Sequence, residues 1–108
     1  MDASTLDHFQ RRATIIKAMA HPSRLLIIDL LSSGERNVGD LQSLVGGDLS
    51  TVSKHLAVLK RAGLVGDRKA GLQVYYRLRV PCIMNFFACV EEVIEHADAQ
   101  VDVACCHR

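Results

Sequence analysis

Apolar positions recur at helical spacing in the first part of the chain. Leu6, Phe9, Ala13, Ile16 and Met19 are separated from one another by three or four residues. This interval places side chains on one face of an α-helix. The pattern therefore predicts a first amphipathic helix that ends near residue 20.

Two further helices are predicted before residue 46. Pro22 follows a break at His21 and suits the first turn of a helix, and the leucine- and isoleucine-rich segment 23–32 continues from it. Gly34 is expected to end this helix, because glycine is favoured just beyond a helix C-terminus. A short third helix is expected over 38–45.

The pattern after the Gly46–Gly47 turn predicts a fourth helix over 50–62. Val52, Leu56 and Leu59 share one face of it, and Asp48 or Ser50 can cap its first turn by accepting backbone N–H bonds. The opposite face carries hydroxyl and basic side chains, which are Thr51, Ser53, Lys54, His55 and Arg61.

The periodicity then changes to that of β-strands. Two short runs, 64–68 and 73–78, flank Gly71, a residue that permits a tight chain reversal, so we expect a β-hairpin. A last apolar helix is predicted to begin at Pro81 and to end near residue 97.

These elements suggest one folded domain over residues 1–98 and a cysteine-containing C-terminal tail over 99–108. A chain of 108 residues that is 49% hydrophobic can bury a modest core as a single domain. Charges break the apolar runs, and the N-terminus does not resemble a signal peptide. We therefore expect a cytoplasmic protein with no membrane partner, and reduced cysteines.

The net charge of +1 conceals a segregation of charge along the chain. Residues 50–79 carry seven basic side chains against Asp67 alone, a net charge of +6. Residues 1–49 carry five basic and six acidic side chains, and 80–108 carry one basic and five acidic. A basic segment in a near-neutral chain favours docking of a polyanion, although a solvated surface would show the same charge count.

The order of the elements favours a winged helix-turn-helix that binds DNA. In this arrangement the second helix of the motif enters the major groove, and small polar side chains near its N-terminus reach bases and phosphates. Arg68 and Lys69 in the hairpin could contact the neighbouring phosphate backbone or minor groove. The alternative is a helical packing unit whose charges serve only solubility.

Four segments resemble those of the ArsR/SmtB family of bacterial metal- and metalloid-responsive repressors. They are KAMAHPSRLLIIDLL, ERNVGDL, LSTVSKHLAVLKRAGLV and GLQVYYRL, within a match over residues 10–95. The resemblance implies a homodimer formed through the first and last helices, and a repressor that leaves its operator DNA when an inducer binds. It also implies a set of DNA-contacting residues, which are Ser50, Thr51, Ser53, Lys54, His55, Arg68 and Lys69.

Three aromatic residues of this region have alternative roles. His55 could contact DNA directly, or it could cap or pack locally against its neighbours. Tyr75 and Tyr76 are interpreted as core and rim aromatics of the hairpin rather than as residues that stack on bases.

The two inducer sites that the resemblance implies are absent in their familiar form. The arsenic-binding motif E-L-C-V-C-D-L corresponds here to residues 35–41, where Asn37 and Gly39 replace the cysteines. The zinc pattern of a D-x-H pair followed by H-x-x-E is not met on the last helix, which has only His96 near its end. A soft ion would therefore have to use cysteines in new places.

All four cysteines, Cys82, Cys89, Cys105 and Cys106, lie in the last quarter of the chain. Seven residues of helix separate Cys82 from Cys89 by about 10.5 Å of rise, whereas two thiolates on one ion lie about 4 Å apart. A tail of about ten residues can extend some 30 Å, so Cys105 or Cys106 could complete a site across the dimer.

Thiolate ligands favour a soft ion as the inducer, and arsenite is the first candidate. His96 and His107 would shift the preference toward zinc. Direct redox or persulfide sensing by the same thiols is an alternative, and Cys82 and Cys89 could instead be small apolar residues of the dimer interface. A small thiol reductase is disfavoured, because the sequence has no phosphate-binding loop and no C-x-x-C pair. We therefore expect no enzymatic activity.

Overall fold

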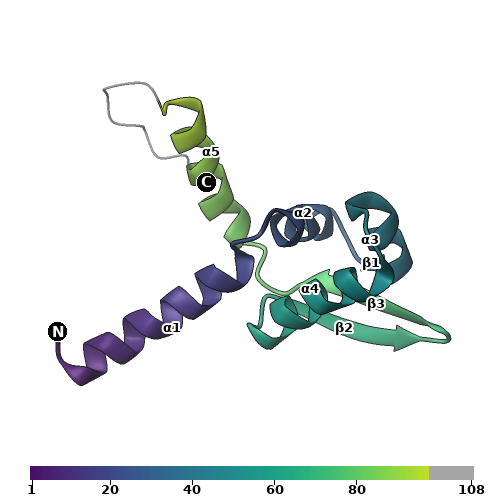
Figure 1. The fold of residues 1–108 in the computed structure, drawn as a ribbon, viewed down its shortest axis with the longest axis horizontal. Helices are drawn as coiled ribbons and strands as arrows, with labels where there is room; N and C mark the ends of the chain where they lie inside the picture. Colours follow the sequence, from purple (N-terminus) through teal and green to yellow (C-terminus); the bar gives the residue numbers. More distant parts are fainter. Residues whose placement is uncertain (98–108) are drawn as a thin grey trace.

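The computed structural model describes residues 1–97 and confirms a mainly helical fold with a β-hairpin (Figure 1). The tail predicted over 99–108, with Cys105 and Cys106, lies outside the described residues. The helices and strands are α1 (Ala3–Met19), α2 (Pro22–Leu31), β1 (Arg36–Asn37), α3 (Val38–Val45), α4 (Leu49–Arg61), β2 (Val65–Ala70), β3 (Gln73–Leu78) and α5 (Ile83–Glu95).

Aspartate or asparagine side chains cap three of these helices, α1, α3 and α4. Asp2, Asn37 and Asp48 accept hydrogen bonds from backbone N–H groups three residues further on. Such a cap satisfies one of the unpaired donors of the first helical turn. This is why α1 begins at Ala3, directly after Asp2, and α4 begins at Leu49, directly after Asp48.

The core lies where α2, α3 and α4 pack together on the sheet. Ile27 and Ile28 of α2, Leu41 of α3, and Leu56 and Leu59 of α4 are each 0% exposed. The apolar face predicted for α4 is therefore the face that anchors it, and its polar face is left outward.

One strand was not predicted from the sequence. The two residues of β1 pair with β3, so the sheet is antiparallel in the order β1-β3-β2, with Arg36 opposite Tyr76. Two residues are too few to show the alternation that identifies a strand. In the hairpin, Gly71 has φ of 64° at the turn, as the tight reversal requires.

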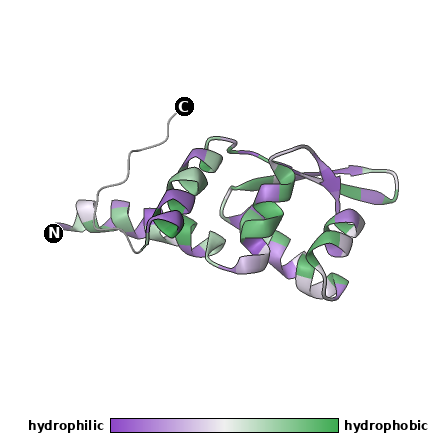
Figure 2. Ribbon diagram, turned by 90° about the horizontal axis from the view of Figure 1, so that it is seen from above, coloured by the Kyte–Doolittle hydropathy of each residue, from purple (hydrophilic) through white to green (hydrophobic). Residues whose placement is uncertain are grey.

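Helices α1 and α5 project away from this core (Figure 1), and hydrophobic residues recur along both of them (Figure 2). No residue of α5 is buried, and Phe86, Val90, Val93 and Ile94 are between 40% and 63% exposed. An apolar surface of this kind marks an interaction site in a protein dissolved in water. Among residues 1–97, no helix is long and apolar enough to cross a membrane.

Candidate nucleic-acid interface

A tight glycine turn sets the angle between α3 and α4. Gly46 and Gly47 have φ of 88° and 80°, in the region that residues with a Cβ rarely adopt. The Asp48 carboxylate then accepts hydrogen bonds from the Thr51 backbone N–H at 2.8 Å and the Ser50 hydroxyl at 2.9 Å. These hydrogen bonds lower the pKa of Asp48, so the cap is ionised at neutral pH.

The first turns of α4 present polar side chains to solvent. Ser50, Thr51, Ser53 and Lys54 are exposed, whereas Val52 between them is 1% exposed. The structure thus brings together four of the predicted DNA-contacting residues on one uncovered face. Small hydroxyl side chains and a flexible cation suit hydrogen bonding to bases and phosphates in a groove that admits a helix.

His55, the fifth predicted contact on α4, differs from these four. Its ring is half-buried, Arg24 donates a hydrogen bond from Nε to His55 Nδ1 at 3.2 Å, and the ring of His21 lies 4.4 Å away between centroids. The structure therefore joins His55 to α2, in agreement with local packing as the alternative. Direct contact between His55 and DNA stays a prediction.

The wing residue Arg68 is held by side chains of its own chain. Its Nε and Nη2 atoms each donate to a carboxylate oxygen of Glu35 at 2.9 Å, and its guanidinium lies 4.8 Å from the centre of the Tyr75 ring. The Arg68 hydrogen bonds lower the pKa of Glu35, so the pair is charged at neutral pH. A phosphate that contacts Arg68 must share it with Glu35.

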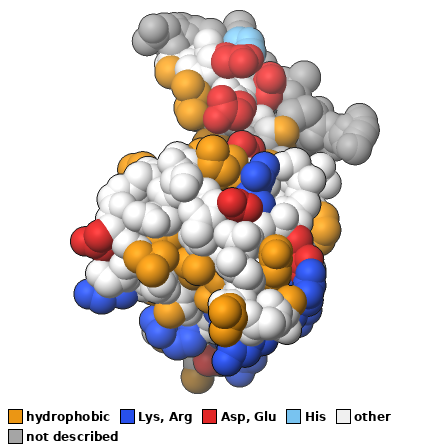
Figure 3. Space-filling model, turned by 90° about the vertical axis from the view of Figure 1, so that its right-hand side faces the viewer, with side chains coloured by type: hydrophobic (Ala, Val, Ile, Leu, Met, Phe, Trp, Pro, Cys, Tyr) orange, Lys and Arg blue, Asp and Glu red, His pale blue; other side chains and the backbone are white. Residues whose placement is uncertain are grey.

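The basic side chains gather over one region of the surface. Figure 3 shows Lys and Arg side chains along the lower margin, over α4 and the hairpin, with Asp and Glu side chains on α5 above. Within the basic region Lys60 pairs with Asp67 at 3.0 Å and ties the end of α4 to β2. Lys54 and Lys69 are exposed. The charge segregation in the sequence thus becomes a spatial segregation that suits a polyanion.

Replacing Glu35 with glutamine is expected to strengthen DNA binding, by about threefold at moderate salt. The change removes the negative charge that neutralises Arg68 in the wing while keeping an amide of the same size. Asp40→Asn is the matched control, because it removes one exposed carboxylate from the first turn of α3 and leaves Arg68 paired. Fluorescence anisotropy with a labelled duplex measures both variants. If Glu35→Gln bound DNA more weakly while Asp40→Asn did not, the Glu35–Arg68 pair would be needed to hold the wing in its DNA-binding conformation.

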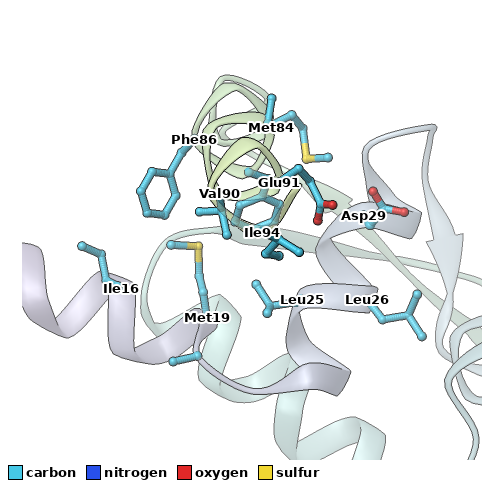
Figure 4. A pocket seen from close by; sticks show the side chains of 13 residues that line it. Ile16, Met19, Leu25, Leu26, Asp29, Met84, Phe86, Val90, Glu91 and Ile94 are labelled. Atoms are coloured by element: carbon cyan, nitrogen blue, oxygen red, sulfur yellow. The ribbon is translucent and has the colours of Figure 1, made fainter. Parts of the chain in front are cut away.

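A second feature is an apolar groove between α1, α2 and α5 (Figure 4). Ile16 and Met19 contribute from α1, Leu25 from α2, and Val90 and Ile94 from α5, with the carboxylates of Asp29 and Glu91 also among its lining residues. The groove lies between the two projecting helices and α2, and no residue of α4 lines it. Its lining suits apolar side chains rather than nucleic acid.

Among residues 1–97, the cysteines lie at α5 and not on α4 or the hairpin. Cys82 is exposed and immediately precedes α5, and Cys89 is half-buried on that helix. Near the end of α5 the ligand atoms of Glu92, Glu95 and His96 lie within 4.8 Å of one another. Exposed carboxylates often cluster in this way without an ion. The cluster therefore gives no reason to change the predicted ion ligands, which are cysteines.

Sequence reasoning missed three residues of this region: His21, Arg24 and Glu35. His21 and Arg24 occupy the H-P-S-R segment that carried part of the resemblance, which was the available signal. Glu35 lies 33 residues from Arg68, and the sequence contains no sign of that pairing. These residues contact His55 and Arg68 and hold their side chains in position.

Comparison with known proteins gives a consistent result. The family model described as bacterial regulatory protein, arsR family, matches residues 21–66. A transcriptional repressor SmtB homolog of Synechocystis is 33% identical over 97 residues, which cover 90% of this chain and 74% of that protein. An HTH-type transcriptional regulator of Mycobacterium tuberculosis is 39% identical over 94% of this chain, which spans only 44% of that regulator's length.

A solved structure extends the similarity to three dimensions. The homodimeric winged helix-turn-helix DNA-binding domain of a possible ArsR-family transcriptional regulator from Mycobacterium bovis superposes with a TM-score of 0.77. It is 32% identical to this chain, and the match covers 96% of each chain. The similarity therefore includes α1 and α5 as well as the helix-turn-helix and the wing.

Proposed function

The chain belongs to the arsR family of bacterial regulatory proteins, and on this basis we propose that it is a homodimeric transcriptional repressor that a soft metal or metalloid ion releases from operator DNA. Helix α4 and the wing are assigned to the DNA. The ion, arsenite in the first place, is assigned to thiolates among Cys82, Cys89, Cys105 and Cys106.

The observation that carries the DNA-binding part is the outer face of α4. Its first turns expose Ser50, Thr51, Ser53 and Lys54 beside a basic hairpin, while the inner face is fixed in the core by Leu56 and Leu59. A helix anchored on one side and polar on the other can enter the major groove without unfolding. The wing then lies where it can reach the neighbouring phosphates.

The dimer is supported by the uncovered apolar surface of α1 and α5. Leu6, Phe9 and Ile16 on α1 are between 42% and 47% exposed, and four apolar residues of α5 are between 40% and 63% exposed, which are Phe86, Val90, Val93 and Ile94. A second copy of the chain would remove this surface from water. The homodimeric Mycobacterium bovis domain, which covers α1 and α5 in the match, supports the same assignment.

The ion site is supported by thiol chemistry and by its location on the dimerising helix. Cys82 and Cys89 precede and occupy α5, where a bound ion could alter the geometry between two protomers. Their separation along one helix, about 10.5 Å of rise, is too long for one ion, so further donors are needed. Cys105 and Cys106 are assigned to that role, although they lie outside the described residues.

The same thiols support a second candidate function. A repressor that responds to oxidants or persulfides would use an accessible cysteine side chain, and Cys82 at the start of α5 is exposed. In that case the DNA-binding part of the proposal is unchanged and only the inducer differs. A thiol reductase of this fold is disfavoured, and turnover of arsenate or of a disulfide substrate by the purified protein would be needed to revive it.

The experiment is a DNA-release titration on a duplex that the purified protein itself selects from a random-sequence pool. Arsenite, antimonite, zinc, cadmium and a persulfide donor are each added to the wild type, Cys82→Ser, Cys89→Ser and the double variant Cys105→Ser/Cys106→Ser. We expect arsenite to release the wild type, and the variant lacking an essential thiolate to need at least about tenfold more, since each lost thiolate removes a strong bond to the ion.

Three outcomes separate the candidates. Release by the persulfide donor but not by arsenite would favour the redox alternative. Unchanged ion sensitivity in every cysteine variant would contradict a thiolate site. Failure of the wild type to select any duplex would contradict the DNA-binding assignment itself.

A further inference from the structure

Three side chains join the recognition helix to the corner between α1 and α2. Arg24 of α2 donates from Nε to His55 Nδ1 of α4 at 3.2 Å and from Nη1 to the Ala18 carbonyl of α1 at 3.0 Å. The His21 ring lies against the His55 ring, with centroids 4.4 Å apart and planes at 45°. One arginine thus connects α1, α2 and α4.

His21 is itself held in place by the backbone. It is the N-cap of α2, and its Nδ1 accepts a hydrogen bond from the Ser23 backbone N–H at 3.1 Å. Its ring is therefore fixed by the first turn of α2, and it provides a rigid surface for the His55 ring. The three residues form a cluster, which we call the His21–Arg24–His55 joint.

The joint requires a neutral His55. Arginine is a donor only, so its Nε–H can bond to His55 Nδ1 only while that nitrogen carries no proton. Burial, followed by the charges of His21 and Arg24, lowers the pKa of His55 below its ordinary value of 6.5. Within residues 1–97, no carboxylate acts on this ring to stabilise an imidazolium.

The consequence for pH has a definite sign. Because the folded state disfavours protonation of His55, the unfolded state binds more protons just below pH 6.5. The stability that the joint contributes is therefore complete above that value and is lost as the pH falls below it. The same holds for any state of the protein, including a DNA-bound one, that needs the Arg24–His55 hydrogen bond.

We propose that Arg24 and His21 are positioning residues that hold α4 at its DNA-binding angle through neutral His55, and that protonation of His55 opens the joint and weakens operator binding. The inference rests on the proposed function, since it assigns regulation to the same DNA-binding helix. It also links that helix to α1, whose exposed apolar face is assigned to the dimer. A shift of α1 in the dimer could therefore change the position of α4 through Arg24.

The joint and direct DNA contact by His55 predict opposite effects of acid. A histidine that contacts a phosphate gains charge on protonation, and the DNA would be bound more tightly. A histidine that must stay neutral to accept from Arg24 gives weaker binding. The direction of the pH profile therefore distinguishes the two roles.

The test is a pH titration of duplex affinity from about pH 8 to about pH 5, on the wild type and His55→Asn. The introduced asparagine side chain offers an acceptor oxygen near the position of the histidine Nδ1 but takes up no proton. Between the alkaline and the acid end, we expect the wild type to lose at least about tenfold more affinity than His55→Asn, because only the wild type takes up a proton at this position, at one decade per pH unit below the pKa for each protomer. His8→Asn, a change of the exposed histidine on α1, should keep the wild-type profile.

Arg24→Lys tests the positioning role. Lysine keeps the charge but lacks the planar fork that reaches Ala18 and His55 together, so we expect weaker DNA binding at every pH with unchanged helix content by circular dichroism. If this variant fails to fold, His55→Asn still decides the question.

Nitrogen NMR of the histidine rings in the DNA-free protein gives an independent readout, because it reports whether Nδ1 of His55 is unprotonated at neutral pH. A protonated Nδ1, tighter binding in acid by the wild type, or an unchanged acid loss in His55→Asn would each overturn the joint. Absence of DNA binding by the wild type at every pH, with the expected NMR signature, would instead contradict the proposed function and leave the joint standing as a structural feature.

Discussion

Val90→Asp is expected to turn the dimer into monomers and to weaken operator binding by at least about 100-fold. Val90 lies on α5 with 40% of its surface exposed and contributes to the apolar groove beside α1. In a dimer with twofold symmetry the substitution places two carboxylates in the interface, and each buried ion costs several kcal/mol. Loss of the dimer separates two DNA-binding helices that otherwise bind as a linked pair.

Sedimentation velocity measures the first effect, and anisotropy with the selected duplex measures the second. Leu44→Asp is the matched control for the oligomeric state, because Leu44 is 51% exposed on α3, away from the groove. That variant should stay dimeric. A Val90→Asp protein that remains a dimer with normal DNA affinity would show that α5 is not the dimerising surface.

The helices could be predicted because their signals are local. Val52, Leu56 and Leu59 repeat at helical spacing, Gly46–Gly47 marks the turn, and all of this information lies within fifteen residues of sequence. The outer face of α4 follows directly, since a buried stripe on a helix leaves the remaining positions to solvent. The exposure of Ser53 and Lys54 was predictable for this reason.

The partners of His55 and Arg68 could not be predicted in the same way. Arg24 is 31 residues from His55, and Glu35 is 33 residues from Arg68. Both pairs depend on tertiary packing, because they join elements that are far apart in the sequence. No periodic pattern in the sequence indicates such pairs. The same applies to β1, whose two residues are ordered by pairing with β3.

This difference changes what the sequence implied about the basic segment. Counted along the chain, its seven cations are equivalent. In the structure Arg68 is bound by Glu35 and Lys60 by Asp67, whereas Lys54 is exposed on the outer face of α4. The cations therefore differ in what a phosphate must displace to reach them, and Lys54 is the one on α4 whose position favours DNA most directly.

Lys54→Glu is accordingly expected to lower the DNA affinity of the dimer by up to about 1,000-fold. A unit charge about 4 Å from a phosphate gains about 1 kcal/mol in water, so reversing its sign changes the energy by about 2 kcal/mol in each protomer and about 4 kcal/mol in the dimer. Lys54 also acts electrostatically on the Asp48 cap, which places its charge near the start of α4. Removal of that charge leaves the ionised carboxylate of Asp48, at the start of α4, with less positive charge to offset it.

Anisotropy at several salt concentrations separates this effect from a general change in net charge. Arg61→Glu is the matched control, because Arg61 is exposed in the last turn of the same helix and undergoes the same reversal. Lys54→Gln should lower the slope of log affinity against log salt by about two, one phosphate contact for each protomer, while Arg61→Gln should leave the slope nearly unchanged. Equal losses of affinity at both positions would mean that DNA binding depends on the overall charge of α4. They would contradict the insertion of the N-terminal turns of α4 into the groove.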